Sequence, residues 1–550
     1  MGTCLPYATG CQPVLPFDFI ASAHPLAQTG AIPAQSPAFR VAGGCALLAL
    51  LARLGLFNVN HAEYTDGILA VFGSQGAQAF WPPLYRWLSI AVGFGRAAEW
   101  SARLVSVAAS SLIVLPIYAA ARGLAPGLAP RGSEAAQREG RRAAAFACLW
   151  YLVSPMALRW GIRMMTDALF ALLFYSAVWA MSEAVRRRKA GGYRADHLLA
   201  AATALTVAAC LTRYQGVLLI PLVFISFGAV RIAWRRQGKG PMLWAILSQV
   251  LWLGLAAWFV AGRGQLFAHG GQVADRAAGG VFTAAVNYWN LFESFVIVSP
   301  YFFTYPIFAL AVWGVIVSRD RVHRWMFAYC ALALLTMQSV FQSFQERYLL
   351  PLLPFMVVYA GVGSAQLASR LGPRRPAWLI GVALCALYCW GFSLAVISWQ
   401  RGVFGDIKAA ALLVKEKAAP GAPIFSNEMY GPQRVPIKMR FWSGRDVQFW
   451  DEGWGGGDGL NGQDGHGGRL PVGAILCVHN LYGPEAFAAT VRRVKDAYRL
   501  ELLDDFHETV VPLLPDVMAV SGTQQNPIGW VLRYQPQEFE TAVFRIEGAK

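Results

Sequence analysis

The chain has 550 residues, of which 56% are hydrophobic and 14% charged, and its mean hydropathy is +0.41. Soluble domains carry about 25% charged residues, so this composition excludes an ordinary soluble protein. The net charge is +16, but residues 401–550 hold 16 basic and 18 acidic residues, so the positive excess belongs to the apolar part. Positive charge between apolar spans is typical of cytoplasmic loops. We therefore predict an integral membrane protein in contact with lipids and without a nucleic-acid partner.

Residues 1–39 are rich in Pro and Ala and nearly uncharged. They lack the basic start, apolar core and cleavage site of a signal peptide, so we predict an N-terminal cytoplasmic tail. Residues 40–400 contain about eleven apolar stretches near the roughly 20 residues that a spanning helix needs, which predicts a transmembrane domain. These stretches are 40–57, 101–121, 143–160, 164–185, 197–212, 216–234, 241–261, 299–318, 325–341, 348–368 and 377–399.

Charge predicts the orientation of these spans. Five alternate connections hold 20 Lys and Arg residues: Arg122–Arg142, Arg186–Arg194, Arg231–Lys239, Arg319–Arg324 and Arg370–Arg375. The connections on the other side carry about nine over a greater length, so the positive-inside rule puts the N-terminus in the cytoplasm. Connections 58–100 and 262–298 and everything after residue 400 then lie outside. The Ala-, Gly- and Arg-rich composition favours a bacterial inner membrane, with these parts in the periplasm.

The two long outer connections differ in pattern. In 58–100, the stretches 68–72 and 84–92 are amphipathic, which predicts helices along the membrane interface. The connection 262–298 is first Gly-rich and then aromatic, and it could form a mobile cover over a site.

Residues 401–550 alternate helix and strand patterns, which predicts a small extracytoplasmic α/β domain. The predicted helices are 409–417 and 486–498, the predicted strands are 423–426 and 474–478, and the stretch 500–503 follows the second helix. Gly453–Gly468 is predicted to be a flexible loop, and it matches no phosphate-binding pattern.

Candidate catalytic residues are the few acids expected on the outer side. Glu63 and Asp66 are three residues apart, so on a helix they would share a face. Two such acids, with Asp167 near the start of the fourth span, could deprotonate a hydroxyl or hold a divalent metal such as Mg²⁺ or Mn²⁺. The alternatives are helix capping and simple solvation. His61 is a polar neighbour that could line the same site.

Candidate phosphate ligands are the arginines of the same side: Arg163, Arg213 and Arg347. A guanidinium group matches two phosphate oxygens at once. Snorkelling to lipid headgroups is the alternative for each arginine, and an ion pair with Glu346 is a further alternative for Arg347. Acids and arginines together suit attack by an acceptor hydroxyl on a sugar carried by a lipid phosphate.

Four stretches resemble the GT-C superfamily, in particular the protein O-mannosyltransferase and aminoarabinose-transferase group (glycosyltransferase family 39). They are His61–Asp66, Trp81-Pro82-Pro83-Leu84-Tyr85, Thr212-Arg213-Tyr214-Gln215-Gly216 and Glu346–Pro354. The resemblance covers roughly residues 40–400, with the α/β tail as a common appendage.

The resemblance implies a glycosyltransferase that uses a polyprenyl-phosphate sugar and inverts the anomeric centre. The acceptor would be a protein, a lipid or a polysaccharide. An acid after the first span would be the base, with Asp167 as a second acidic site and Tyr64, Tyr85 and Tyr348 as further site-lining residues. The family has Asp-Glu side by side, whereas this chain has Ala62-Glu63 and then Asp66, so both acids stay candidates.

Two other classes of membrane protein compete with this interpretation. A transporter or lipid-carrier flippase would also contain buried acids and arginines, but it would more often have internal repeats with interrupted helices in matching halves. A sensor with an extracytoplasmic binding domain would not need Glu63, Asp66, Asp167 and Arg347 to lie close together.

Overall fold

The computed structural model describes residues 37–72, 82–124, 133–189, 195–236, 251–252, 254, 304–341, 346–371, 375–427, 434–450, 470–480, 484–510 and 537–550. Most of the predicted tail and most of the span 241–261 lie outside these residues. The whole of the predicted cover 262–298 and of the glycine-rich loop 453–468 also lies outside them. In the apolar part the helices are α1 (Pro37–Gly55), α2 (Thr65–Phe72), α3 (Leu84–Val92), α4 (Glu99–Leu112), α5 (Val114–Leu124), α6 (Glu134–Leu152), α7 (Pro155–Gly161), α8 (Thr166–Lys189), α9 (Ala195–Cys210), η3 (Tyr214–Leu219), α10 (Ile220–Arg236), α14 (Tyr305–Val317), α15 (Arg321–Phe341), η5 (Glu346–Leu352), α16 (Leu353–Arg370) and α17 (Arg375–Gln400).

Among the described residues, four helices are long and apolar enough to cross a membrane: Glu99–Leu124, Thr166–Arg188, Arg347–Arg370 and Pro376–Gln400. The predicted span 143–160 is not one straight helix, because α6 and α7 meet there at a 59° bend; the pair is a broken span or a re-entrant loop. Pro155 explains the break, since a proline ring removes a backbone donor and clashes with the preceding turn. The chain is thus a helical membrane protein with four or five such spans among these residues.

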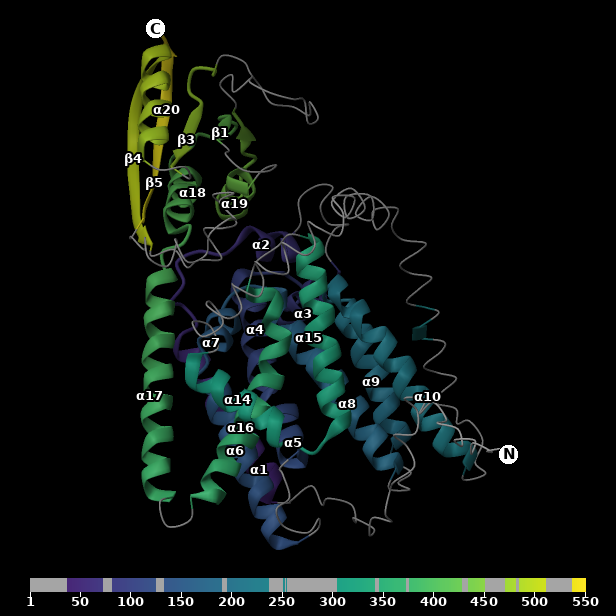
Figure 1. The fold of residues 1–550 in the computed structure, drawn as a ribbon. Helices are drawn as coiled ribbons and strands as arrows, with labels where there is room; N and C mark the ends of the chain where they lie inside the picture. Colours follow the sequence, from purple (N-terminus) through teal and green to yellow (C-terminus); the bar gives the residue numbers. More distant parts are fainter. Residues whose placement is uncertain are drawn as a thin grey trace, which may run out of the picture.

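Span burial separates helices inside the bundle from those at its edge. In the apolar window of the Arg347–Arg370 span, 94% of the residues are buried, against 33% for Pro376–Gln400. The α17 helix runs along the side of the bundle (Figure 1), so one face is uncovered by protein. That face is apolar, and it would contact lipid tails; its large exposed side chains are Leu379, Ile380, Leu384, Leu387 and Tyr388.

Glycines permit the closest helix contacts in the bundle. A Cβ added at Gly314 on α14 would lie 1.8 Å from the carbonyl oxygen of Tyr359 on α16. One added at Gly361 on α16 would lie 2.4 Å from the carbonyl oxygen of Ala143 on α6. Small residues allow membrane helices to approach backbone to backbone, so α16 is fixed between α14 and α6.

The C-terminal region contains α18 (Gly405–Lys417), β1 (Ile424–Ser426), α19 (Arg434–Ser443), β2 (Gln448–Phe449), β3 (Ile475–His479), α20 (Pro484–Ala497), β4 (Tyr498–Val510) and β5 (Gln537–Ala549). Both predicted helices and both predicted strands are confirmed, and the stretch 500–503 lies in β4. The strands form a mixed sheet in the order β2-β1-β3-β5-β4, in which β1 is parallel to β2 and β3, and β5 is antiparallel to β3 and β4.

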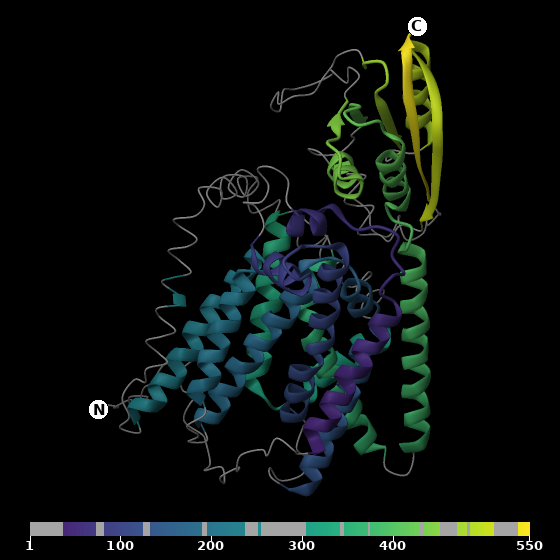
Figure 2. The ribbon, with the colours of Figure 1, turned by 180° about the vertical axis from the view of Figure 1, so that it is seen from behind.

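The side chains of β3 alternate between the two faces of this sheet. Ile475 and Cys477 pack in the same apolar cluster as α18 and α19, whereas Leu476 and Val478 pack in the cluster that contains α20. Helices therefore cover both faces. The region stands over the bundle end at which α2 lies, as views from opposite sides show (Figures 1 and 2).

Candidate active site

Asp66 and Arg347 form an ion pair at the bundle end that faces the C-terminal region. Asp66 lies in the first turn of α2, and Arg347 is the second residue of η5. Arg347 Nη2 donates to Asp66 Oδ2. The Arg347 side chain is 6% exposed and that of Asp66 is 35% exposed. The pair thus combines a buried cation with a carboxylate that solvent still reaches.

A second pair, Asp167 and Arg213, lies beside the first. Asp167 is in the first turn of α8, as predicted, and Arg213 immediately precedes η3. Arg213 Nη1 donates to Asp167 Oδ1 at 2.5 Å and to Thr166 Oγ1 at 3.1 Å. The guanidinium groups of Arg213 and Arg347 lie 5.0 and 5.1 Å from the centre of the Tyr348 ring. We call Asp66, Asp167, Arg213, Arg347 and Tyr348 the acid–arginine cluster.

Glu63 is outside this cluster. It lies in the non-helical segment 56–64, so the expectation that Glu63 and Asp66 share a helix face is wrong. Its carboxylate accepts from Arg103 Nε and, at 3.1 Å, from the backbone N–H of Met164. The residue is fully buried. Burial raises the pKa of the Glu63 carboxyl, and the positive charges of Arg103 and Arg163 oppose this shift, so its ionisation depends on these arginines staying in place.

Arg163 and Tyr64 belong to a neighbouring contact. The Arg163 guanidinium carbon lies 4.7 Å from the centre of the Tyr64 ring, and its Nη2 donates to the Gln400 carbonyl at 3.0 Å. Arg159 Nη2 donates to the Gln400 side chain at 2.6 Å. These contacts join the residues around α7 to the end of α17.

The remaining predicted lining residues lie at different depths. The His61 side chain is 43% exposed, and its Nδ1 lies 2.7 Å from Glu508 Oε1 on β4. Tyr85 is fully buried on α3, and its hydroxyl donates to the Ala102 carbonyl of α4 at 2.8 Å. Tyr348 belongs to the acid–arginine cluster, since the guanidinium groups of Arg213 and Arg347 both lie against its ring.

The sequence analysis missed Arg103. It lies inside the predicted span 101–121, and it is 5% exposed. A charged residue at membrane depth is costly and marks a polar partner or a functional site, and this signal could have identified it.

The three predicted acids do not form one metal-binding group, because Glu63, Asp66 and Asp167 pair with Arg103, Arg347 and Arg213 respectively. In the described part of the chain, one group of three residues has ligand atoms within 4.8 Å of one another: Asp505, His507 and Glu540. This group lies on β4 and β5.

The cluster has the chemical groups for acid–base and phosphate chemistry. A partly exposed carboxylate can accept a proton from a hydroxyl. Two guanidinium groups can bind a phosphate ester and stabilise negative charge that grows on it. The buried surroundings strengthen these charge interactions relative to water.

No protein-family model and no curated protein matches the chain. Solved structures do match. The crystal structure of ArnT from Cupriavidus metallidurans bound to undecaprenyl phosphate aligns with a TM-score of 0.51 and 15% identity, covering 92% of this chain and 98% of that one. The apo state of the same protein aligns with a TM-score of 0.52 and 16% identity over the same shares. An oligosaccharyltransferase from Archaeoglobus fulgidus aligns with a TM-score of 0.43 and 14% identity, over 73% of this chain and 62% of that one.

The match to ArnT extends over both the helix bundle and the C-terminal region, since it covers nearly the whole of both chains. This chain therefore shares the fold of the ArnT structures, which is the kind of fold that the sequence resemblance implied. At 15–16% identity the likeness establishes the fold alone.

Proposed function

We propose that this chain transfers a sugar from a polyprenyl-phosphate carrier to the hydroxyl of an acceptor, at the bundle end that bears the acid–arginine cluster. The observation that carries the proposal is the Asp66–Arg347 pair beside Asp167–Arg213, which combines a carboxylate open to solvent with two arginines. The ArnT structure of the same fold holds undecaprenyl phosphate, which supports the choice of donor class.

Asp66 is the better candidate for the base. Both oxygens of Glu63 accept hydrogen bonds, from Arg103 and Met164, and the residue is fully buried. A general base must come within hydrogen-bond reach of the hydroxyl that it deprotonates. The Asp66 side chain is 35% exposed, so an acceptor can approach it.

The reaction follows from these positions. Asp66 takes the hydroxyl proton as the acceptor oxygen forms a bond to the anomeric carbon of the sugar. The bond between that carbon and the phosphate oxygen breaks, and its electron pair leaves with the lipid phosphate. Arg347 and Arg213 stabilise the phosphate charge. Attack opposite the leaving group inverts the anomeric centre. Charge distribution favours a periplasmic site for this step.

The test uses purified protein in lipid nanodiscs, a panel of radiolabelled polyprenyl-phosphate sugars and either water or a crude acceptor extract. We expect the wild type to release or transfer sugar from at least one donor. Asp66→Asn should lower kcat by about 10²–10⁴-fold, the usual contribution of a general base. Arg370→Lys, at the opposite end of α16, is the matched control and should keep wild-type activity.

Two results would contradict parts of the proposal. Full activity of Asp66→Asn would return the role of base to Glu63. Absence of turnover with every donor, with or without divalent metal, would sink the transferase assignment, and translocation of the carrier across the membrane would then establish the transporter alternative.

A further inference from the structure

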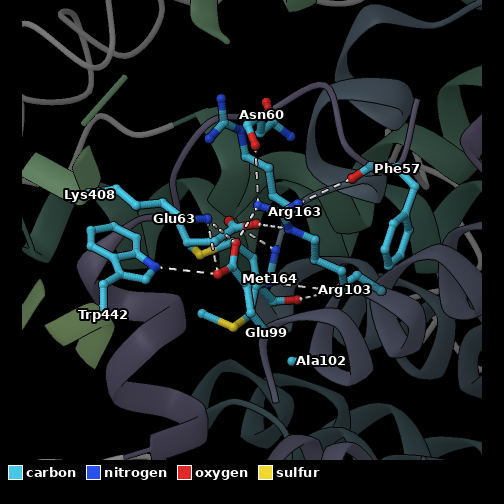
Figure 3. A network of polar contacts seen from close by, with 12 residues as sticks. Phe57, Asn60, Glu63, Glu99, Ala102, Arg103, Arg163, Met164, Lys408 and Trp442 are labelled. Carbon is cyan, nitrogen blue, oxygen red and sulfur yellow. Dashed lines mark hydrogen bonds and ion pairs between the residues drawn. The ribbon is translucent and has the colours of Figure 1, made fainter. Parts of the chain in front are cut away.

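We propose that the C-terminal region positions the catalytic base: Lys408 and Trp442 hold Glu99 and Arg103, and these hold the segment 56–64 that leads directly into Asp66. This inference rests on the proposed function, because it concerns the base of that reaction. We call Glu63, Glu99, Arg103, Lys408 and Trp442 the Glu99 network (Figure 3).

Glu99 is the residue at which the two parts of the chain meet. It lies in the first turn of α4. Arg103, on the same helix, donates to its Oε1 at 2.7 Å. From the C-terminal region, Lys408 Nζ on α18 lies 3.1 and 3.2 Å from its two oxygens, and Trp442 Nε1 on α19 donates to Oε2 at 3.3 Å. One carboxylate thus bonds groups from three helices.

Arg103 connects Glu99 to the segment 56–64 through hydrogen bonds. Besides Glu99, it donates to the Glu63 carboxylate and, at 3.3 Å each, to the carbonyls of Phe57 and Asn60. The charges alternate along Lys408, Glu99, Arg103 and Glu63, and they sum to zero. Loss of the Lys408 charge leaves Glu99 with Arg103, which Glu99 shares with Glu63, in a mostly buried place where a poorly paired charge is costly.

Two further contacts from the C-terminal region reach the same segment. Glu508 on β4 pairs with His61 at 2.7 Å. Phe404 precedes α18 with a left-handed φ of 62° and meets the Tyr64 ring edge-on at 5.7 Å. This backbone conformation costs a non-glycine residue free energy, so the surrounding contacts must hold Phe404 in it. The segment before Asp66 is therefore held by the C-terminal region at His61, at Tyr64 and through the Glu99 network.

The apolar core is also shared across this junction. Ile407, Ala411 and Trp442 from the C-terminal region belong to the same buried cluster as Ile68 of α2 and Met164. Phe72 of α2 lies 4.4 Å from Phe441 of α19, measured between ring centres. Movement of α18 and α19 would thus shift α2, whose first turn contains Asp66.

The test uses full-length protein in lipid nanodiscs and three variants: Lys408→Met, Trp442→Phe and the double variant. Lys408→Met keeps the length of the side chain, and Trp442→Phe keeps an aromatic ring. Lys417→Met is the matched control, because Lys417 lies on the same helix, is exposed and pairs with Glu416 at 3.8 Å. Lys408→Arg tests rescue by a conservative cation.

The first measurement is amide hydrogen exchange over residues 56–66, which needs no substrate. We expect faster exchange in Lys408→Met and in Trp442→Phe, and wild-type exchange in Lys417→Met. Unchanged exchange in both Lys408→Met and Trp442→Phe would overturn the proposal, whatever the activity.

The second measurement separates kcat from the donor KM. We expect kcat to fall about tenfold to a hundredfold, as small misplacement of a reacting group does, while the donor KM stays within about twofold, because Arg347 and Arg213 are outside the network. The double variant should lose less than the product of the two single effects, since both act through Glu99. Lys408→Arg should restore most of kcat.

A wild-type kcat in Lys408→Met would overturn the positioning role even if exchange increases. If the wild type turns over no donor, the proposed function fails, and the exchange result alone then decides whether the C-terminal region holds the segment.

Discussion

At the residue scale, arginine–carboxylate pairing decides which groups can react. Asp66, Asp167 and Glu63 each have their own arginine, but their exposure differs: the Asp66 side chain is 35% exposed, whereas those of Asp167 and Glu63 are 2% and 0% exposed. Buried ion pairs are expensive to break from one side. We therefore propose that Asp167 and Glu63 hold Arg213 and Arg103, and that Asp66 is the carboxylate that substrate reaches.

Arg347→Lys tests the phosphate role of this arginine. Lysine keeps the charge but loses the planar pair of donors, and the two residues are not interchangeable at such a site. We expect the donor KM to rise about tenfold through the lost charge-assisted hydrogen bond. Steady-state kinetics over a donor series measures this effect, and Arg370→Lys is the control. An unchanged KM would show that Arg347 only holds Asp66.

At the element scale, helix α2 is fixed by one close backbone contact. Gly67 follows Asp66 directly, and a Cβ added there would lie 1.8 Å from the carbonyl oxygen of Met164. The helix could not keep this position with any larger residue. The place of Asp66 thus depends on a glycine that the sequence analysis did not single out.

Gly67→Ala should therefore displace α2. We expect the free energy of unfolding to fall by about 1–3 kcal/mol, as overpacking does, together with a loss of transfer activity. Gly381→Ala on α17 is the control, because nothing lies within 4 Å of its added Cβ. Thermal unfolding in nanodiscs measures both variants. Equal stability of the two would mean that α2 packs differently against Met164.

The C-terminal region contains a buried contact between a carboxylate and a histidine, with a testable pH dependence. Asp406 Oδ2 lies 2.7 Å from His479 Nδ1 and accepts from Thr541 Oγ1 at 2.7 Å. Burial acts to raise the pKa of the Asp406 carboxyl, but His479, Thr541 and the Ile407 backbone outweigh it and lower this pKa below its usual value. The charged carboxylate is therefore favoured in the folded region.

A lowered folded-state pKa contributes stability above the unfolded pKa of about 3.9, and this stability is lost as the pH falls through the folded value. We expect the C-terminal region to lose stability below about pH 4. In Asp406→Asn the fall should be shallower, and stability at pH 7 should be lower by about 3–5 kcal/mol, since one partner of a buried pair is removed. Tryptophan fluorescence follows unfolding of the wild type and of Asp406→Asn from pH 7 to pH 3. If the two proteins lose stability in the same way as the pH falls, Asp406 does not cause the acid sensitivity.

At the scale of the whole molecule, the helix bundle and the C-terminal region act as one unit around the site. They share a buried apolar cluster, and α17 leads directly from one to the other. The proposed reaction requires a lipid donor from the bilayer and an acceptor from the aqueous side. The junction between the two parts is where both can meet.

The positive-inside rule predicts the orientation of the whole molecule in the membrane. The Lys and Arg residues of the five basic connections put Lys550 on the side opposite the cytoplasm. A periplasmic phosphatase fused after Lys550 should be active in bacterial cells, and a fluorescent protein fused there should be dark. The same reporters inserted within 186–194 should give the opposite result. If the fluorescent protein fused at Lys550 is bright, the topology is the inverse of the predicted one, and the proposed site lies on the cytoplasmic side.

The sequence by itself determined the membrane class, the amphipathic helices at 68–72 and 84–92 and, in the C-terminal region, two of the helices and two of the strands. Those properties follow from local composition and periodicity, which short stretches of chain carry. It also identified Asp66, Asp167, Arg213 and Arg347 as candidates, since charges are rare next to apolar spans.

Only the tertiary structure decided which charges meet. Asp66 and Arg347 are 281 residues apart, and Lys408 and Glu99 are 309 apart. No local pattern encodes such a pairing, because it depends on how helices pack and on backbone contacts such as that of Gly67 with Met164. Glu63 illustrates the difference: spacing alone put it beside Asp66 on a helix, whereas packing buried it against Arg103 and left Asp66 accessible.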